Sequence, residues 1–185
     1  MDDLLYQSAL AYQSLMPYRY SFMLGHKMKS SYISIYFPED AYHHLAGFQY
    51  SGIAALQNQK TALQIILAKQ ITHEHFAKEG FQHEDRWQGI CQLQNMIETN
   101  ELIFHFRGHE KVGSNIIADY VIHNPSSFFF MCENDPVSIF GNTGQNYQKG
   151  CPRYVVLKTW RENIATLEKT LVYQSLSFRE TPSEL

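Results

Sequence analysis

The sequence predicts an α+β fold in which N-terminal helices pack on a C-terminal antiparallel sheet, with a short N-terminal hairpin. Apolar residues recur at helical intervals between Lys60 and Asn100, and they alternate with period two after Glu101. Gly, Asn, Asp and Pro separate the short apolar runs of the second half, as turns do in an antiparallel sheet. Helical patterns followed by strand patterns are typical of the α+β class.

The first forty residues predict one helix and two paired strands. A helical pattern runs from Leu4 to Tyr12 and ends before Pro17, which cannot continue a helix. Residues 18–24 and 31–37 then alternate with period two on either side of Gly25. The sequence therefore predicts an antiparallel hairpin with its turn near Gly25.

The remaining chain divides into a helical part and a strand part. Residues 60–100 predict two or three helices interrupted near Gly80, and residues 101–160 predict one sheet. Residues 165–176 fit either a short helix or a final strand. With no repeat or linker, we expect a single domain over residues 1–185, with a loose tail at about 177–185.

Composition excludes several classes of protein. The formal charge of −3 does not fit a strongly basic nucleic-acid binder, although a local basic groove remains compatible with it. Three cysteines without CxxC spacing argue against a disulfide framework and a zinc ribbon. The start of the chain is acidic, and no apolar run is long enough to span a bilayer. We expect a soluble cytoplasmic protein without membrane contact.

Two adjacent histidines open the stretch YHHLAGFQY. On a helix, His44 shares a face with Ala41, Leu45 and Phe48, whereas His43 points away. The pattern predicts that His44 lies against the apolar stripe, where desolvation would lower its pKa, and that His43 faces water. His44 is then either a proton-transfer group or a core histidine bonded to a buried carbonyl.

The other histidines do not predict a metal centre. His73 and His75 lack HExxH spacing and would point in nearly opposite directions on a helix. The sequence also lacks a GxSxG elbow, a Walker loop and a dinucleotide fingerprint. We therefore predict no metal site and no cofactor, and take solvated histidines as the simpler interpretation.

Two later segments carry candidate site residues. If residues 113–125 form a strand, Asp119 interrupts an apolar face, either as a hydrogen-bond acceptor for a turn or as an acid/base group. A glycine-bracketed loop then ends in Tyr147 and leads into a basic run that also contains Tyr154 and Trp160. Such a run can hold phosphates and stack bases, or it can protect a solvated strand edge. Its basic residues are Lys149, Arg153, Lys158 and Arg161.

Five stretches in succession resemble the fourth group of the phage-associated Barnase/EndoU/Colicin/RelE-like (BECR) nucleases. The resemblance covers roughly residues 5–165 and keeps the expected order. The first stretch is a strand followed by a helix with a His-Leu-x-Gly motif. The second is a helix with a central arginine, Arg86. The stretches are YISIYFPEDAYHHLAGFQY, HEDRWQGI, GSNIIADYVI, SSFFFMCEN and SIFGNTGQNYQKG.

The resemblance implies helices packed on a four- or five-stranded antiparallel sheet and metal-independent RNA cleavage by a protein of phage or prophage origin. It places His44 as base or acid, Asp119 and Tyr147 as residues that supply or orient the second proton-transfer group, and Ser114 as a hydrogen-bond donor to the phosphate. Arg86, Arg153 and Lys158 would stabilise the charge of the phosphorane, with Lys149 and Arg161 completing the RNA-binding set.

Other functions remain open from the sequence. A non-catalytic descendant of this fold could bind RNA or a host protein, and a nuclease toxin could have a neutralising protein partner. A metal-dependent enzyme built on the histidines is a third interpretation, which a chelator would separate from the first.

Overall fold

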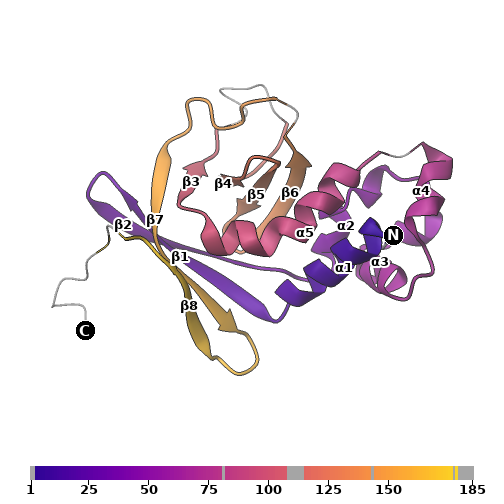
Figure 1. Ribbon diagram of the computed structural model, residues 1–185, viewed down its shortest axis with the longest axis horizontal. Helices are drawn as coiled ribbons and strands as arrows, with labels where there is room; N and C mark the ends of the chain where they lie inside the picture. The colour runs from indigo at the N-terminus through magenta and orange to yellow at the C-terminus, as the bar shows by residue number, and fades with distance from the viewer. Residues whose placement is uncertain (1–2, 81, 108–114, 143, 177, 179–185) are drawn as a thin grey trace.

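The computed structural model describes residues 3–80, 82–107, 115–142, 144–176 and 178 (Figure 1). Its helices and strands follow one another in the order that the sequence patterns predict. The helices are α1 (Leu4–Leu15), α2 (Ala41–Leu45), α3 (Gln59–Leu67), α4 (His73–Glu79) and α5 (Glu84–Thr99), with short 3-10 turns η1 (Phe48–Tyr50) and η2 (Ala54–Leu56). The strands are β1 (Tyr18–His26), β2 (Lys29–Tyr36), β3 (Leu102–His105), β4 (Tyr120–His123), β5 (Ser127–Cys132), β6 (Asp135–Gly141), β7 (Arg153–Asn163) and β8 (Lys169–Gln174).

The strands form one curled sheet in the order β2-β1-β7-β3-β4-β5-β6, and every paired strand is antiparallel to its neighbour. β7 lies at its centre, with β3 paired to its first residues and β8 paired to its second half along the same edge. The curl brings β2 to the turn between β5 and β6, where the Asn134 amide donates to the Ser34 carbonyl at 2.8 Å. The curled sheet thus surrounds a hollow that α5 occupies, and α1–α4 are grouped beside it (Figure 1).

The predicted hairpin is present, but its turn and its place in the fold differ from the expectation. Gly25 lies inside β1, and the turn is made by Lys27 and Met28 at φ 47° and 62°. Positive φ at both turn residues matches the twist of a two-residue hairpin, which overrides the poor preference of these side chains. β1 also pairs with β7 from Tyr18 to Gly25, so the hairpin is part of the main sheet.

The described residues form an eight-stranded sheet, not the four- or five-stranded sheet that the resemblance implies, because the hairpin and the last strand join it through β7. Expectations for the helical segment and the later strands are confirmed. The helical segment breaks at residues 68–72 and at Gly80, which ends α4 with φ 69°. Residues 101–160 supply five of the sheet's strands, and the ambiguous segment near residue 170 is β8.

Helix α5 fills the hollow of the sheet. Its Trp87, Ile90 and Leu93 are fully buried in one core with inward side chains of β1, β5 and β6. A second, smaller core lies on the opposite face of β3–β5, where Phe128 and Phe130 pack beneath Tyr147 from the loop before β7. Both faces of this half of the sheet are therefore covered, which explains why β5 reads as a continuous apolar run.

Gly89 allows α5 to approach the sheet closely. A Cβ atom at this position would lie 2.9 Å from Cδ1 of Ile139 and 3.2 Å from Oγ of Ser127. Both neighbours are buried and belong to β6 and β5, so neither can move freely.

We expect Gly89→Ala to lower the free energy of unfolding by up to about 2 kcal/mol. Overpacking a core costs about 1–3 kcal/mol and outweighs the roughly 1 kcal/mol that alanine gains in helix propensity. Gln88→Ala, at the exposed neighbouring position, is the matched control and should change stability little. Urea unfolding measures both variants, and an increase in stability for Gly89→Ala would contradict this packing.

Candidate functional site

The two adjacent histidines are arranged opposite to the expectation. His43 is 3% exposed, whereas His44 is an exposed residue of α2. The buried face of this short helix consists of Tyr42, Leu45 and Ala46, so the helix is rotated by one position from the predicted orientation. Tyr42 fixes that rotation, because its hydroxyl hydrogen-bonds Oγ of Ser8 at 2.9 Å. The desolvation expected for His44 falls on His43.

Burial lowers the pKa of His43, and the neighbouring His44 ring, 5.2 Å away between centroids, lowers it further. The Leu56 backbone opposes these two effects. His43 packs edge-on against Phe48, with ring centroids 6.1 Å apart. It is thus a core histidine that favours the neutral form.

Arg86 joins three elements near the N-terminus of α5. It is 4% exposed, and its guanidinium lies 4.2 Å from the centroid of the Phe140 ring. Nη1 donates to Oγ of Ser138 at 3.2 Å and, at 3.4 Å, to the carbonyls of His44 and Leu45 at the end of α2. These contacts hold α2 against β6, because a cation at a helix C-terminus is favourable there.

An open pocket of about 750 Å³ lies beside Arg86. His83 lines it, and burial and the Arg86 charge lower the pKa of His83. Its acidic residues are already engaged, since Asp85 accepts from the Gly141 amide at 2.9 Å and Glu84 pairs with His73 at 2.6 Å. The pocket is lined by Gln82, His83, Glu84, Asp85, Arg86, Phe140, Gly141 and Asn142.

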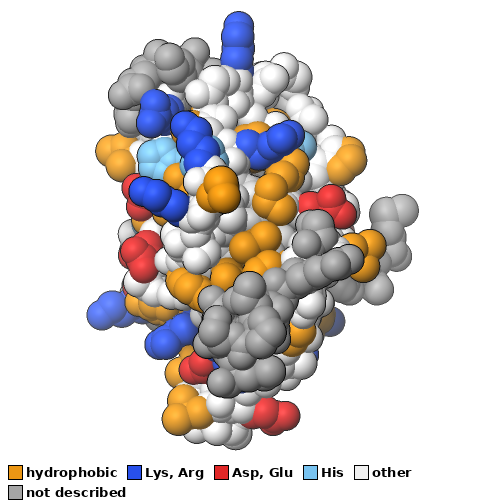
Figure 2. All heavy atoms as spheres, turned by 90° about the vertical axis from the view of Figure 1, so that its left-hand side faces the viewer, with side chains coloured by type: hydrophobic (Ala, Val, Ile, Leu, Met, Phe, Trp, Pro, Cys, Tyr) orange, Lys and Arg blue, Asp and Glu red, His pale blue; other side chains and the backbone are white. Residues whose placement is uncertain are grey.

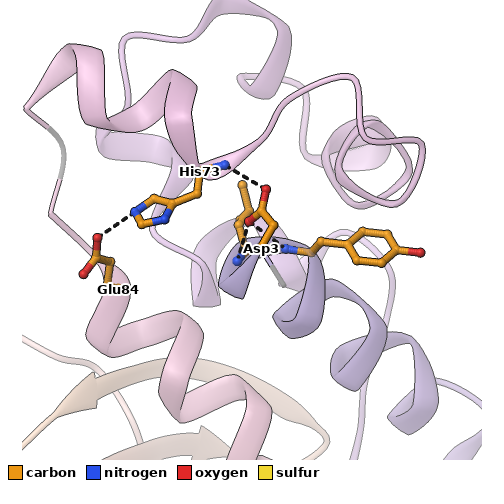
Figure 3. A network of polar contacts seen from close by, with 5 residues as sticks. Asp3, His73 and Glu84 are labelled. Atoms are coloured by element: carbon orange, nitrogen blue, oxygen red, sulfur yellow. Dashed lines mark hydrogen bonds and ion pairs between the residues drawn. The ribbon is translucent and has the colours of Figure 1, made fainter. Parts of the chain in front are cut away.

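His73 and His75 have structural partners at the start of α4. Asp3 accepts from the His73 amide at 3.0 Å, and the His73 ring pairs with Glu84 (Figure 3). His75 completes a capping box with Thr72. The HEH motif therefore connects α1, α4 and α5. No group of three or more His, Cys, Asp or Glu side chains that could hold a metal ion occurs in the described part of the chain.

The strand predicted around Asp119 is shorter than expected. β4 begins only at Tyr120, and Asp119 precedes it as an exposed residue. The backbone of Asp119 still bonds both neighbours, donating to Met131 at 3.1 Å and accepting from Phe106 at 2.7 Å. Ser114 lies outside the described residues.

Tyr147 and the basic run do not gather in one place. Tyr147 covers the second core on the face of the sheet opposite α5, where burial raises its pKa. Lys149 and Arg153 are exposed, near the start of β7. Arg161 lies on the helix side, where it donates to Glu98 at 3.1 Å. None of the described contacts joins His44, Asp119 and Tyr147 into one cleft.

A cluster that the sequence analysis missed lies where four adjacent strands begin or end. His26 ends β1, Tyr154 lies at the start of β7, His105 ends β3 and Tyr120 begins β4. The His26 and Tyr154 rings stack with centroids 4.7 Å apart, and those of His105 and Tyr120 meet edge to face at 5.8 Å. We call these four residues the strand-end cluster.

The strand-end cluster faces the hollow of the sheet. Tyr120 and Tyr154 pack against the core that α5 fills, and all four side chains are half-buried. Burial raises the pKa of Tyr120, and the hydroxyl of Tyr154 and the carboxylates of Asp119 and Glu133 raise it further. Nδ1 of His105 is buried without a hydrogen-bond partner among the described residues.

The Arg153 carbonyl next to the cluster fixes which ring nitrogen of His26 carries a proton. Its Nδ1 lies 2.9 Å from the Arg153 carbonyl, which can only accept a hydrogen bond. Nδ1 therefore carries the proton, and in the neutral ring Nε2 is the basic nitrogen. Two histidines and two tyrosines at one end of the sheet are residue types that can accept and donate protons.

The family model for phage-Barnase-EndoU-ColicinE5/D-RelE like nuclease4 (PBECR4) matches residues 4–175. The chain belongs to this family. The match includes every strand of the sheet and all four members of the strand-end cluster. Membership in PBECR4 indicates a nuclease of the BECR superfamily and a nucleic-acid substrate. No curated protein and no solved structure matches the chain.

Among the described residues, no helix of the PBECR4 domain is long and apolar enough to cross a membrane.

We expect His43 to make the domain less stable in mild acid. The pKa of His43 is lowered in the folded state, so the unfolded chain takes up a proton at higher pH than the folded chain does. The stability that neutral His43 contributes is therefore fully present above the pKa of the unfolded chain's histidine, about 6.5, and it decreases as pH falls below that value. Thermal unfolding measured between about pH 7 and pH 5 should show a steeper loss for the parent than for His43→Leu. His44→Ala should flatten the slope less than His43→Leu does, because the His44 ring is the smaller cause of the lowered pKa of His43. Gln88→Ala, at an exposed position of α5, is the control and should keep the parent's pH dependence; an equal slope in His43→Leu would contradict the assignment.

Proposed function

We propose that this PBECR4 domain is a metal-independent endoribonuclease whose proton-transfer groups are in the strand-end cluster. The observation that carries the proposal is the convergence of His26, Tyr154, His105 and Tyr120 from four adjacent strands. Family membership supports a nuclease, and the cluster supplies the residue types that nuclease chemistry without a metal requires.

RNA suits such a site because it carries its own nucleophile. A base removes the proton of the 2′-hydroxyl, and the 2′-oxygen attacks the adjacent phosphorus. The bond from phosphorus to the 5′-oxygen then breaks, and an acid protonates the leaving oxygen. The products are a 2′,3′-cyclic phosphate and a free 5′-hydroxyl. DNA lacks the 2′-hydroxyl, so the same groups would have no internal nucleophile to activate.

The contacts of the cluster suggest which residue takes each role. His26 is the proposed base, because the Arg153 carbonyl leaves Nε2 free to accept the 2′-hydroxyl proton. Tyr120 is a hydrogen-bond donor to the phosphate, because its raised pKa keeps it protonated at neutral pH. His105, beside Tyr120, is the proposed acid for the 5′-oxygen. Exposed Arg153 and Lys149, near the start of β7, would attract the RNA backbone.

The candidate site residues from the sequence have different roles in this proposal. Asp119 supports Tyr120, whose pKa it raises. Tyr147 lies on the other face of the sheet, so we propose that it stabilises the second core. His44 remains the alternative base, since it is exposed and its carbonyl contacts Arg86 beside the pocket of His83. A phage or prophage origin and a neutralising protein partner remain proposals that follow from the family name.

The first test compares histidine variants. His26→Ala and His105→Ala should each lose about a hundred- to ten-thousand-fold in the rate of RNA cleavage, the usual cost of losing a general acid or base. Both side chains are half-buried, so thermal unfolding must show that each variant is folded at the assay temperature. His44→Ala is the matched control and should cleave like the parent. If His44→Ala alone abolishes cleavage, the site belongs to α2 and the pocket beside Arg86.

The second test addresses the metal and the substrate. Cleavage should persist in excess EDTA, and an oligonucleotide with 2′-O-methyl groups should resist cleavage because its 2′-oxygen cannot lose a proton. Loss of activity with EDTA that Mg²⁺ or Zn²⁺ restores would favour the metal-dependent alternative. Binding of RNA without cleavage by the folded parent would favour the non-catalytic alternative.

A further inference from the structure

A second aromatic site lies on the face of the sheet opposite the hollow. Tyr32 of β2 and Trp160 of β7 lie on either side of β1, with ring centroids 6.4 Å apart and ring planes 27° from parallel. Tyr32 is 62% exposed, although a large aromatic side chain usually gains energy from burial. Two nearly parallel rings at the surface form a platform on which a flat group can stack.

Two lysines flank this platform. Nζ of Lys169 lies 4.8 Å from the Trp160 ring centroid, and Nζ of Lys158 lies 5.8 Å from it. Cation–π attraction to the Trp160 ring favours these positions for both ammonium groups. Positive charge is thus held next to the half-buried Trp160 ring, and Nζ of Lys158 also lies 5.2 Å from the Phe178 ring centroid. Arg161 lies on the other face, where it pairs with Glu98.

A surface pocket of about 390 Å³ adjoins the platform. Its lining combines the two aromatic rings with serine hydroxyls and the Lys169 ammonium, and Glu133 is its one carboxylate. Glu133 also raises the pKa of Tyr120. The same carboxylate therefore lines this surface pocket and acts electrostatically on the strand-end cluster. The lining residues are Ser21, Tyr32, Ile33, Ser34, Glu133, Trp160 and Lys169.

The broader surface also suits a polyanion. Lys and Arg side chains gather over the upper part of this side of the molecule, whereas few Asp or Glu side chains do (Figure 2). The tip of the β1–β2 hairpin contributes exposed Lys27 and Lys29. It lies beside the start of β7, since His26 hydrogen-bonds the Arg153 carbonyl. Basic residues therefore gather at the edge of the strand-end cluster, at the start of β7, the strand that carries Trp160.

We propose that Tyr32, Trp160, Lys158 and Lys169 form a binding site for single-stranded RNA, separate from the catalytic cluster. A base stacks on the rings of Tyr32 and Trp160, and the ammonium groups of Lys158 and Lys169 contact the flanking phosphates. Paired bases in a duplex do not expose their faces, so the site selects single strands. The choice of RNA rests on the proposed function; the stacking and charge geometry stand without it.

Tryptophan fluorescence reads this site directly. The chain has two tryptophans, and Trp87 is fully buried, so a bound base can stack only on Trp160. A single-stranded oligonucleotide with 2′-O-methyl groups cannot be cleaved and should quench the Trp160 fluorescence. A duplex of the same sequence should quench much less. Unchanged Trp160 fluorescence at saturating single strand would overturn the proposal.

Variants separate the stacking and charge contributions. Tyr32→Ala should weaken binding of the single strand at least about fivefold, since a stacking partner contributes roughly 1–3 kcal/mol. Lys169→Ala should weaken binding and reduce the slope of log affinity against log salt by about 1. Lys60→Ala on α3 is a matched exposed-lysine control and should leave the slope unchanged. Affinity and slope equal to those of the parent in both test variants would exclude this site.

A dinucleotide substrate separates this proposal from the proposed function. It is too short to occupy both sites, so Tyr32→Ala and Lys169→Ala should cleave it at the parent rate while losing activity on long RNA. If the parent cleaves no RNA but the uncleavable strand still quenches Trp160, the catalytic proposal fails and the binding site stands. If long RNA is cleaved equally well by parent and variants, the binding site fails and the catalytic proposal stands.

Discussion

The pairing of β1 with β7 is the interaction on which the rest of the structure depends. It joins a strand that begins at residue 18 to one that begins at residue 153, and each of these strands has further partners. β1 carries β2 with it, and β7 carries β3 and β8. Without this pairing the N-terminal hairpin would have no sheet to join, and α5 would have no closed hollow to fill. The cost of closing so long a loop is offset by the apolar area that the hollow buries.

A bulge in β7 assigns side chains to the two faces. Met23 pairs with Lys158 and Leu24 pairs with Val156, so Leu157 is the extra residue. Val156 and Thr159 consequently both face the helices, although three positions separate them. Beyond the bulge, Trp160 faces outward and Arg161 inward. The strand-end cluster and the proposed RNA site thus lie on opposite faces of the sheet, and both include residues of β7.

The α2 region shows how burial and charge settle the role of each histidine. Burial of the ring keeps His43 in the neutral form, because desolvation penalises the charged form most. Arg86 carries a permanent charge into the same region, and the carbonyls at the end of α2 and the Phe140 ring compensate for its burial. Packing therefore explains both His43 and Arg86. The half-buried side chains of the strand-end cluster are better candidates for proton transfer than the buried His43.

The sequence by itself determined the local elements and the class of fold. Periodicity located the three central helices, the strands after Glu101 and the break at Gly80, because these follow from side-chain spacing and backbone preference within a few residues. The succession of motifs also indicated the family. It did not locate the hairpin turn, since Lys27 and Met28 are poor turn residues that the pairing of the flanking strands forces to positive φ.

Only the tertiary structure decided which residues meet. The rotation of α2 depends on a hydroxyl contact between Tyr42 and Ser8, 34 positions apart, so a five-residue pattern could not show which histidine is buried. His26, His105, Tyr120 and Tyr154 have no shared motif, because strand order rather than spacing brings them together. The faces of Lys158 and Arg161 depend on a bulge that leaves no period in the sequence. Local spacing specifies how each segment folds, whereas contacts between distant segments specify the site.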